Sequence, residues 1–164
     1  MSYITNNMIK LLENTNLLKS DVQAIAHCCN CHCIMGGGIA SQIKQYFPEA
    51  YDADLTTSLQ KHNKLGKYSV AEITQPLIKT NIKYVYNLYG QTNFGVDKRH
   101  LDYEAIYNSM ELMSKDCINK NIKTIGIPMN MGCGLAGGKW LIVHSMIQTI
   151  LDNDFDVHIC EYKG

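Results

Sequence analysis

Histidine and cysteine side chains crowd into one short stretch of this chain, where several kinds of chemistry are conceivable. Residues 27–33 read HCCNCHC. Thiolate and imidazole groups bind zinc, and a thiol with a lowered pKa can act as a nucleophile. The spacing argues against zinc, because structural zinc sites use two separated pairs of ligands and the second pair would need single cysteines such as Cys133 or Cys160. We expect small buried thiols here and no metal site.

Two glycine clusters lie between an apolar segment and an amphipathic one. Gly36, Gly37 and Gly38 precede IASQIKQYF, and residues 132–138, GCGLAGG, follow the apolar segment IKTIGIP and precede Trp140. Seven of the twelve glycines lie in these two loops. Bare backbone N–H groups and the positive end of a following helix bind phosphate. Two such loops that meet at one sheet edge predict a ligand with two phosphates.

Three polar residues near these loops are candidates for chemistry. The amide of Asn30 can bond a ribose or satisfy loop backbone, and the residues alone leave both readings open. His32 can act as a general acid near a phosphate, or be exposed and idle. Cys133 stands at a helix entrance but is followed by GLAGGK, without the arginine of cysteine phosphatases. We expect no covalent cysteine catalysis.

A further loop, with Gln91 and Phe94, has the composition of a loop that closes over a bound sugar or base.

Apolar patterns predict the elements that position these loops. Runs rich in β-branched and aromatic residues predict strands at 22–28, 68–73, 82–89, 123–127 and 155–160, with weaker candidates at 3–5 and 8–11. Helical spacing predicts helices at 39–47, 103–117 and 140–151, and Pro48 predicts another within 48–62. The alternation predicts a single three-layer α/β/α domain over residues 1–164, with a mixed, mostly parallel central sheet. Both glycine loops fall at carboxyl ends of strands, where such sheets bind ligands.

The composition of the chain limits the classes of partner that it is expected to bind. At 164 residues and 46% hydrophobic, the chain suits one compact domain. Lys plus Arg equals Asp plus Glu at 15 each, so no long-range field favours nucleic acid or an anionic membrane. Arg99 is the only arginine, which leaves anion binding mainly to backbone amides. The odd number of cysteines, seven, favours reduced thiols. We expect a cytoplasmic monomer that binds no nucleic acid and no membrane.

Asn30 ahead of GGGIA, and IKTIGIP leading into GCGLAGG and Trp140, together resemble the macro domain, an ADP-ribose-binding α/β fold. The resemblance spans residues 13–162 and implies an ADP-ribose site without a cofactor. The run HCCNCHCIMGGGIASQIKQYFPEAY is most similar to the ADP-ribose-1''-phosphate phosphatases. That likeness implies hydrolysis of the terminal monoester to ADP-ribose and phosphate, with His32 or Asn30 as catalytic residues.

The resemblance also implies a set of substrate-binding residues. ENTNLL places Asn14 where many macro domains use aspartate at the adenine. The two glycine loops would hold the diphosphate and the distal ribose, with Asn30 at that ribose. The implied set is Asn14, Asn30, Gly36, Gly37, Gly38, Ile39, Gly132, Cys133, Gly134, Leu135, Ala136 and Gly137.

Two alternative functions stay open beside the phosphatase. Macro-domain glycohydrolases, which remove ADP-ribose from modified macromolecules, share the His27-Cys28 pair and the GCGL string at 132–135. One type has an aspartate where this chain has Ala40, and another has an aspartate at the position of Ala136 and a lysine near Gln91 that this chain lacks. Alanine supplies no carboxylate, which counts against both types. A non-catalytic ADP-ribose-binding module is the other alternative.

Overall fold

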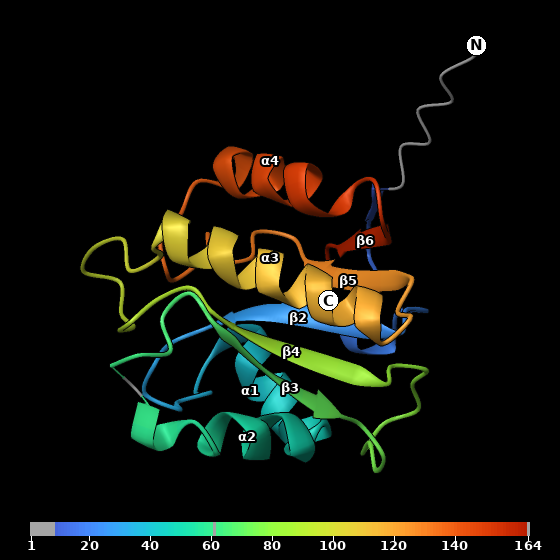
Figure 1. Ribbon diagram of the computed structural model, residues 1–164, viewed down its shortest axis with the longest axis horizontal. Helices are drawn as coiled ribbons and strands as arrows, with labels where there is room; N and C mark the ends of the chain where they lie inside the picture. The colour runs from blue at the N-terminus through green and yellow to red at the C-terminus, as the bar shows by residue number, and fades with distance from the viewer. Residues whose placement is uncertain (1–8, 61, 164) are drawn as a thin grey trace.

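The computed structural model describes residues 9–60 and 62–163, and its strands form the middle layer of the molecule (Figure 1). These residues contain a six-stranded sheet of order β1-β6-β5-β2-β4-β3. Neighbouring strands are parallel except β3 and β4, which are antiparallel. The strands are β1 Ile9–Leu12, β2 Ala24–Cys29, β3 Tyr68–Glu72, β4 Tyr84–Tyr89, β5 Thr124–Pro128 and β6 Asp156–Cys160.

The predicted mixed, mostly parallel sheet is confirmed. Five predicted strands and the weaker one at 8–11 appear with bounds shifted by at most two residues. The weak candidate at 3–5 lies outside the described residues.

Helices cover both faces of the sheet (Figure 1). Helices α1 Gly38–Tyr46 and α2 Pro48–Leu55 lie on one face, and α3 Tyr103–Asn119 and α4 Trp140–Leu151 lie on the other. Short 3-10 turns occur at Leu17–Lys19 and Ser58–Gln60. The helix predicted within 48–62 is confirmed as α2, which begins at Pro48 and ends at Leu55. The hydroxyls of Thr56 and Thr57 donate to the carbonyls of Ala53 and Asp54, and such local bonds compete with helix continuation.

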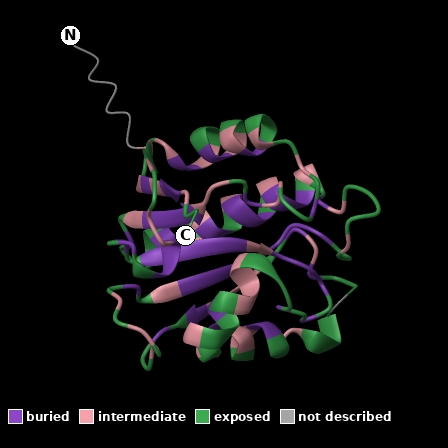
Figure 2. Ribbon diagram, turned by 180° about the vertical axis from the view of Figure 1, so that it is seen from behind, coloured by how far each residue is buried: buried purple, intermediate pink, exposed green. Residues whose placement is uncertain are grey.

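Buried residues lie along the strands and on helices of both outer layers, so the core occupies both faces of the sheet (Figure 2). Ala24 and Ala26 of β2 pack in the apolar cluster under α3 and α4, while Ile25 packs with Ile43 and Phe47 under α1 and α2. Adjacent side chains of a strand point to opposite faces, so β2 contributes to both clusters. No helix in the described part of the chain is long and apolar enough to cross a membrane.

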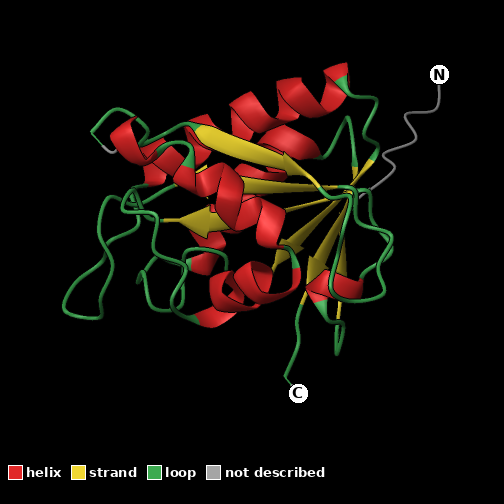
Figure 3. Ribbon diagram, turned by 90° about the horizontal axis from the view of Figure 1, so that it is seen from below, coloured by secondary structure: helices red, strands yellow, loops and turns green. Residues whose placement is uncertain are grey.

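Parallel strands bring their following loops to a common edge. The segments after β2, β4 and β5 lead into α1, α3 and α4, and they lie beyond the strand ends (Figure 3). The sheet places β2 between β4 and β5, so these three segments are neighbours although they are far apart in sequence.

Candidate functional site

A pocket of about 650 Å³ lies where the segments after β2, β4 and β5 meet. Both glycine loops contribute to its wall. Of the residues predicted to bind substrate, the pocket is lined by Asn30, Gly36, Gly37, Gly38, Ile39, Gly132, Gly134, Leu135 and Ala136.

The first glycine turn presents the start of α1 to the pocket. Gly37 is the N-cap residue, with φ −146° and ψ 165°, and no side chain caps the helix. Gly38 has φ +55°, a left-handed conformation that favours glycine. The first N–H groups of a helix have no partner within it and carry its positive end. This turn therefore has the geometry of an anion cradle.

The second glycine turn is packed against the loop after β4. The N–H of Gly138 donates to the carbonyl of Gly132 at 3.0 Å, and the carbonyl of Ala136 accepts from the N–H groups of His100 and Leu101 at 2.8 and 3.1 Å. Gly132 has φ +73°, and a Cβ there would lie 2.8 Å from Leu101 Cδ1. Only glycine fits this position without movement of Leu101.

The two glycine turns face each other across the pocket. A Cβ built on Gly37 would have Leu135 Cδ1 as its neighbour at 3.8 Å. Leu135 belongs to the second turn, and 66% of its surface is exposed. The two distant turns therefore converge on one site.

The amide of Asn30 serves the backbone of its own turn. Its Nδ2 donates to the carbonyl of Ile34 at 2.8 Å, and its Oδ1 accepts from the N–H of His32 at 2.9 Å. Asn30 is buried and lines the pocket. Asn30 therefore satisfies the loop backbone, and its predicted roles at the distal ribose and in catalysis stay predictions.

His32 lies outside the pocket lining but contacts one of its residues, Phe94. It is exposed, its Nε2 lies 2.7 Å from Asn93 Oδ1, and its ring meets Phe94 edge-on at 6.4 Å between centroids. His32 is not among the residues that line the pocket. Its catalytic role stays a prediction.

Three other predicted substrate-binding residues do not line this pocket: Asn14, Cys133 and Gly137. Asn14 is exposed in the loop after β1, with φ +51°. The thiol of Cys133 turns to the carbonyl of Met131 at 3.4 Å. At Gly137, a Cβ would lie 3.2 Å from Arg99 Cα, so this glycine serves packing.

The pocket lining carries no ordinary acid or base at neutral pH. Among its described residues there is no Asp, Glu, His, Lys or Arg. Burial raises the pKa of the Cys28 thiol to about 12, and burial likewise raises the pKa of Cys29 well above its usual value. Both thiols therefore stay protonated, and neither is a ready nucleophile. Binding must rest on backbone dipoles, amides and apolar contacts.

The crowded histidines and cysteines do not assemble a ligand set. No group of three His, Cys, Asp or Glu side chains in residues 9–60 and 62–163 could hold a metal ion. All seven cysteines are free. His27 is fully buried, its Nε2 lies 2.7 Å from Asn87 Oδ1, and burial lowers its pKa to about 4.

Several lining residues were absent from the predicted substrate-binding set. The loop after β4 contributes Gln91, Phe94 and Val96, and the end of β5 contributes Met129 and Asn130. The composition of the first loop had indicated a sugar or base contact. Asn130 has φ +64°, a conformation that asparagine tolerates. Its position directly after a predicted strand could have identified it as a pocket residue from the sequence.

A family model described as the macro domain matches residues 26–147. The chain belongs to the macro-domain family. This macro domain is 38% identical over 127 residues to an uncharacterized 17.5 kDa protein from the tk-vs intergenic region of Enterobacteria phage T4, covering 76% of this chain and 77% of that protein.

Other relatives of the macro domain carry functional names. It is 27% identical over 139 residues to the human ADP-ribose glycohydrolase OARD1, covering 85% of this chain and 80% of that protein. It is 26% identical over 155 residues to a DNA ADP-ribosyl transferase and DNA ADP-ribosyl glycohydrolase fusion protein of Thermosipho africanus. That match covers 86% of this chain and 40% of the fusion protein.

Solved structures share the macro-domain fold. The macrodomain of Mycobacterium tuberculosis DarG has a TM-score of 0.74 at 22% identity, covering 94% of this chain and 99% of that one. Thermosipho africanus DarTG in complex with ADP-ribose has a TM-score of 0.78 at 20% identity, covering 93% of this chain and 41% of that one. The predicted three-layer fold and the family resemblance are confirmed. The names of these relatives and structures do not include a phosphatase.

Proposed function

We propose that this macro domain binds ADP-ribose between its two glycine turns and removes it from modified macromolecules. The convergence of both turns on one pocket carries the proposal. The uncapped start of α1 suits a diphosphate, and the apolar lining from Ile34, Phe94 and Val96 suits a ribose or base. The human relative and the Thermosipho relative are both named as glycohydrolases, which supports this choice over a phosphatase.

The chemistry must proceed without a carboxylate from the described lining. Hydrolysis breaks the bond from C1'' of the distal ribose to the macromolecule, water adds its oxygen to C1'', and the proton goes to the leaving group. Such transition states carry positive charge on the sugar. Ala40 and Ala136 offer no base, and the amide of Asn30 supports the turn. The protein would therefore contribute by positioning the distal ribose and the attacking water. A diphosphate held near C1'' would stabilise that charge.

A phosphatase is the second candidate, and the uncharged lining favours it. Hydrolysis of a phosphate monoester can rest on oriented N–H donors around the transferring group, without a nucleophile from the protein. The similarity of the HCCNCHCIMGGGIA run to ADP-ribose-1''-phosphate phosphatases adds support. Asn30 and His32 remain its candidate catalytic residues.

One assay set separates these functions. Purified protein is incubated with auto-ADP-ribosylated protein, with ADP-ribosylated DNA and with ADP-ribose-1''-phosphate, while calorimetry measures ADP-ribose binding. Release of ADP-ribose from either macromolecule is the expected result. Release of inorganic phosphate alone would favour the phosphatase, tight binding without turnover would favour a binding module, and no binding of ADP-ribose would refute the assignment of the pocket.

A further inference from the structure

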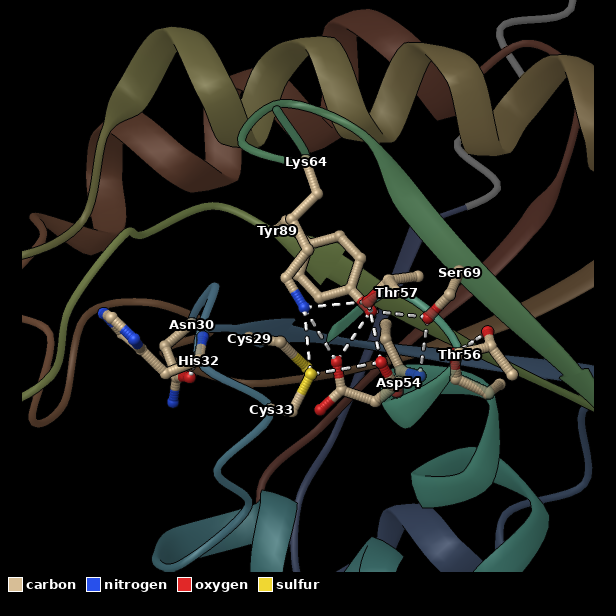
Figure 4. Close-up of polar contacts among 12 residues, drawn as sticks. Cys29, Asn30, His32, Cys33, Asp54, Thr56, Thr57, Lys64, Ser69 and Tyr89 are labelled. Carbon is tan, nitrogen blue, oxygen red and sulfur yellow. Dashed lines mark hydrogen bonds and ion pairs between the residues drawn. The ribbon is translucent and has the colours of Figure 1, made fainter. Parts of the chain in front are cut away.

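A buried lysine beside Cys33, in the turn after β2, lies outside the pocket lining and is shielded from solvent. Lys64 is 1% exposed, and its Nζ lies 3.2 Å from Asp54 Oδ1, 2.8 Å from Thr57 Oγ1 and 3.4 Å from Cys33 Sγ. Figure 4 shows these groups converging below the ring of Tyr89, whose centroid is 4.1 Å from Nζ. We call Lys64, Asp54, Thr57, Cys33 and Tyr89 the Lys64 cluster.

The Lys64 cluster is fully paired but is not an efficient way to stabilise a fold. An ammonium group has three donors, and all three find acceptors here. Burial of an ion pair costs desolvation free energy, so apolar residues of similar volume often stabilise a core as well or better. A buried pair of this kind is better explained by what it holds in place.

Cys33 connects the Lys64 cluster to the wall of the pocket. Its φ is +56°, a conformation that residues with a Cβ seldom adopt unless their surroundings enforce it. Its Sγ donates to the carbonyl of Asp54 at 3.2 Å and accepts from Lys64. Cys33 precedes Ile34 and the three glycines, and Ile34 and the glycines line the pocket. Asn30 holds the same turn from its other side.

Tyr89 connects the cluster to a second wall. Its hydroxyl donates to Asp54 Oδ1 at 2.8 Å and lies 2.7 Å from Ser69 Oγ. Tyr89 is the last residue of β4, two positions before Gln91 in the pocket lining. The cluster therefore spans from the turn after β2 to the end of β4.

We propose that Lys64 is a positioning residue of the pocket. Its ammonium group holds Cys33 in the left-handed conformation and fixes the 30–36 turn, which sets the direction of the backbone N–H groups at the start of α1. The effect on ligand affinity rests on the proposed ADP-ribose site, whereas the effect on the turn does not.

Hydrogen exchange of the ligand-free protein tests the turn directly. In Lys64→Met, we expect amides of residues 31–39 to exchange at least tenfold faster than in the native protein, with unchanged exchange in α3 and α4. The matched control is Lys120→Met, because Lys120 pairs with Asp116 and Tyr86 donates to that carboxylate on the opposite face of the sheet. The control should leave residues 31–39 unchanged.

ADP-ribose calorimetry on the same proteins measures the consequence for binding. Lys64→Met should weaken affinity at least tenfold, and the Lys120 control should bind normally. Cys33→Ser keeps a hydroxyl donor and acceptor and should stay within threefold of the native protein. Cys33→Gly accepts a positive φ but lacks the side chain, so it should resemble Lys64→Met, and it serves as the second variant if the lysine variant does not fold.

The proposal would be overturned if Cys33→Gly or Lys64→Met showed the same amide exchange rates in residues 31–39 and the same ADP-ribose affinity as the native protein. Uniformly faster exchange in every element would do the same, because it would reveal only a general loss of stability. If the native protein binds no ADP-ribose, the proposed function fails, while the local exchange pattern still decides whether Lys64 positions the turn.

Discussion

Replacement of Gly37 by glutamate should remove ADP-ribose binding without disturbing the fold. Gly37 has an extended backbone, with φ −146°, that any residue can adopt. A Cβ there would meet only Leu135 Cδ1 at 3.8 Å, which is ordinary contact. Gly37 is also exposed. The free energy of unfolding should therefore change by no more than about 0.5 kcal/mol.

The loss of affinity follows from charge placed at the anion cradle. A carboxylate about 6 Å from one phosphate charge, at an effective dielectric constant of about 20, costs about 3 kcal/mol, or roughly a hundredfold in Kd. The side chain also occupies space at the N-cap of α1, where the diphosphate is expected. Added salt should recover part of the loss, because it screens the exposed charge.

Calorimetric titration with ADP-ribose measures this effect, and thermal unfolding checks the fold. Gly37→Gln is the matched control, since it has nearly the same size without the charge. We expect the glutamine variant to bind more tightly than the glutamate variant by at least tenfold. Undiminished affinity in a glutamate variant with native unfolding would show that the diphosphate does not lie at α1.

Three other variants test separate parts of the structure. Gly132→Ala should lower the free energy of unfolding in urea by about 1–3 kcal/mol, because Gly132 has φ +73° and its added Cβ would crowd Leu101. Burial lowers the pKa of His27 from 6.5 to about 4, so the unfolded chain binds a proton that the folded chain excludes. Stability present above pH 6.5 should be lost as pH falls toward 4, by about 2 kcal/mol between pH 7.5 and 5. His27→Gln should show a smaller loss in denaturant titrations at the two pH values. Asn30→Ala breaks the bonds to residues 32 and 34 and should weaken ADP-ribose binding roughly tenfold in calorimetry, whereas equal affinity would show that the turn holds without the amide.

The glycine turns were predictable because their signal is local. Each cluster stands between a strand pattern and a helix pattern, and in a parallel sheet that position alone places a loop at the ligand edge. Gly36 to Gly38, Gly132 and Gly134 line the pocket as that reasoning requires. Binding of ADP-ribose in this pocket was instead an implication of the family resemblance, because no single residue pattern specifies that ligand.

The Lys64 cluster was not predictable in the same way. Asp54 falls within the helix predicted in 48–62, and Lys64 follows that segment without any prediction; charged residues of both types are normally solvated. Their burial results from packing of α2 and the following loop against β4, which places Tyr89 over the ammonium group. No periodicity within either segment specifies that contact.

The HCCNCHC run shows why residues that are adjacent in sequence need not form one chemical site. Strand alternation sends His27 and Cys29 to one face of β2 and Cys28 to the other, and both Cys28 and Cys29, at the end of the strand, line the pocket. The ring of His27 is within hydrogen-bond distance of Asn87 on β4. Cys33 lies beyond the end of β2, where its thiol accepts a hydrogen bond from Lys64. Residues that are adjacent in sequence thus lie in three separate environments. In none of these environments do several side-chain donors converge as a metal site requires. The proposed recognition rests on the backbone amides after the run, so substitutions at Gly37 and Lys64 should weaken ADP-ribose binding more than Cys33→Ser, which keeps a hydrogen-bonding side chain.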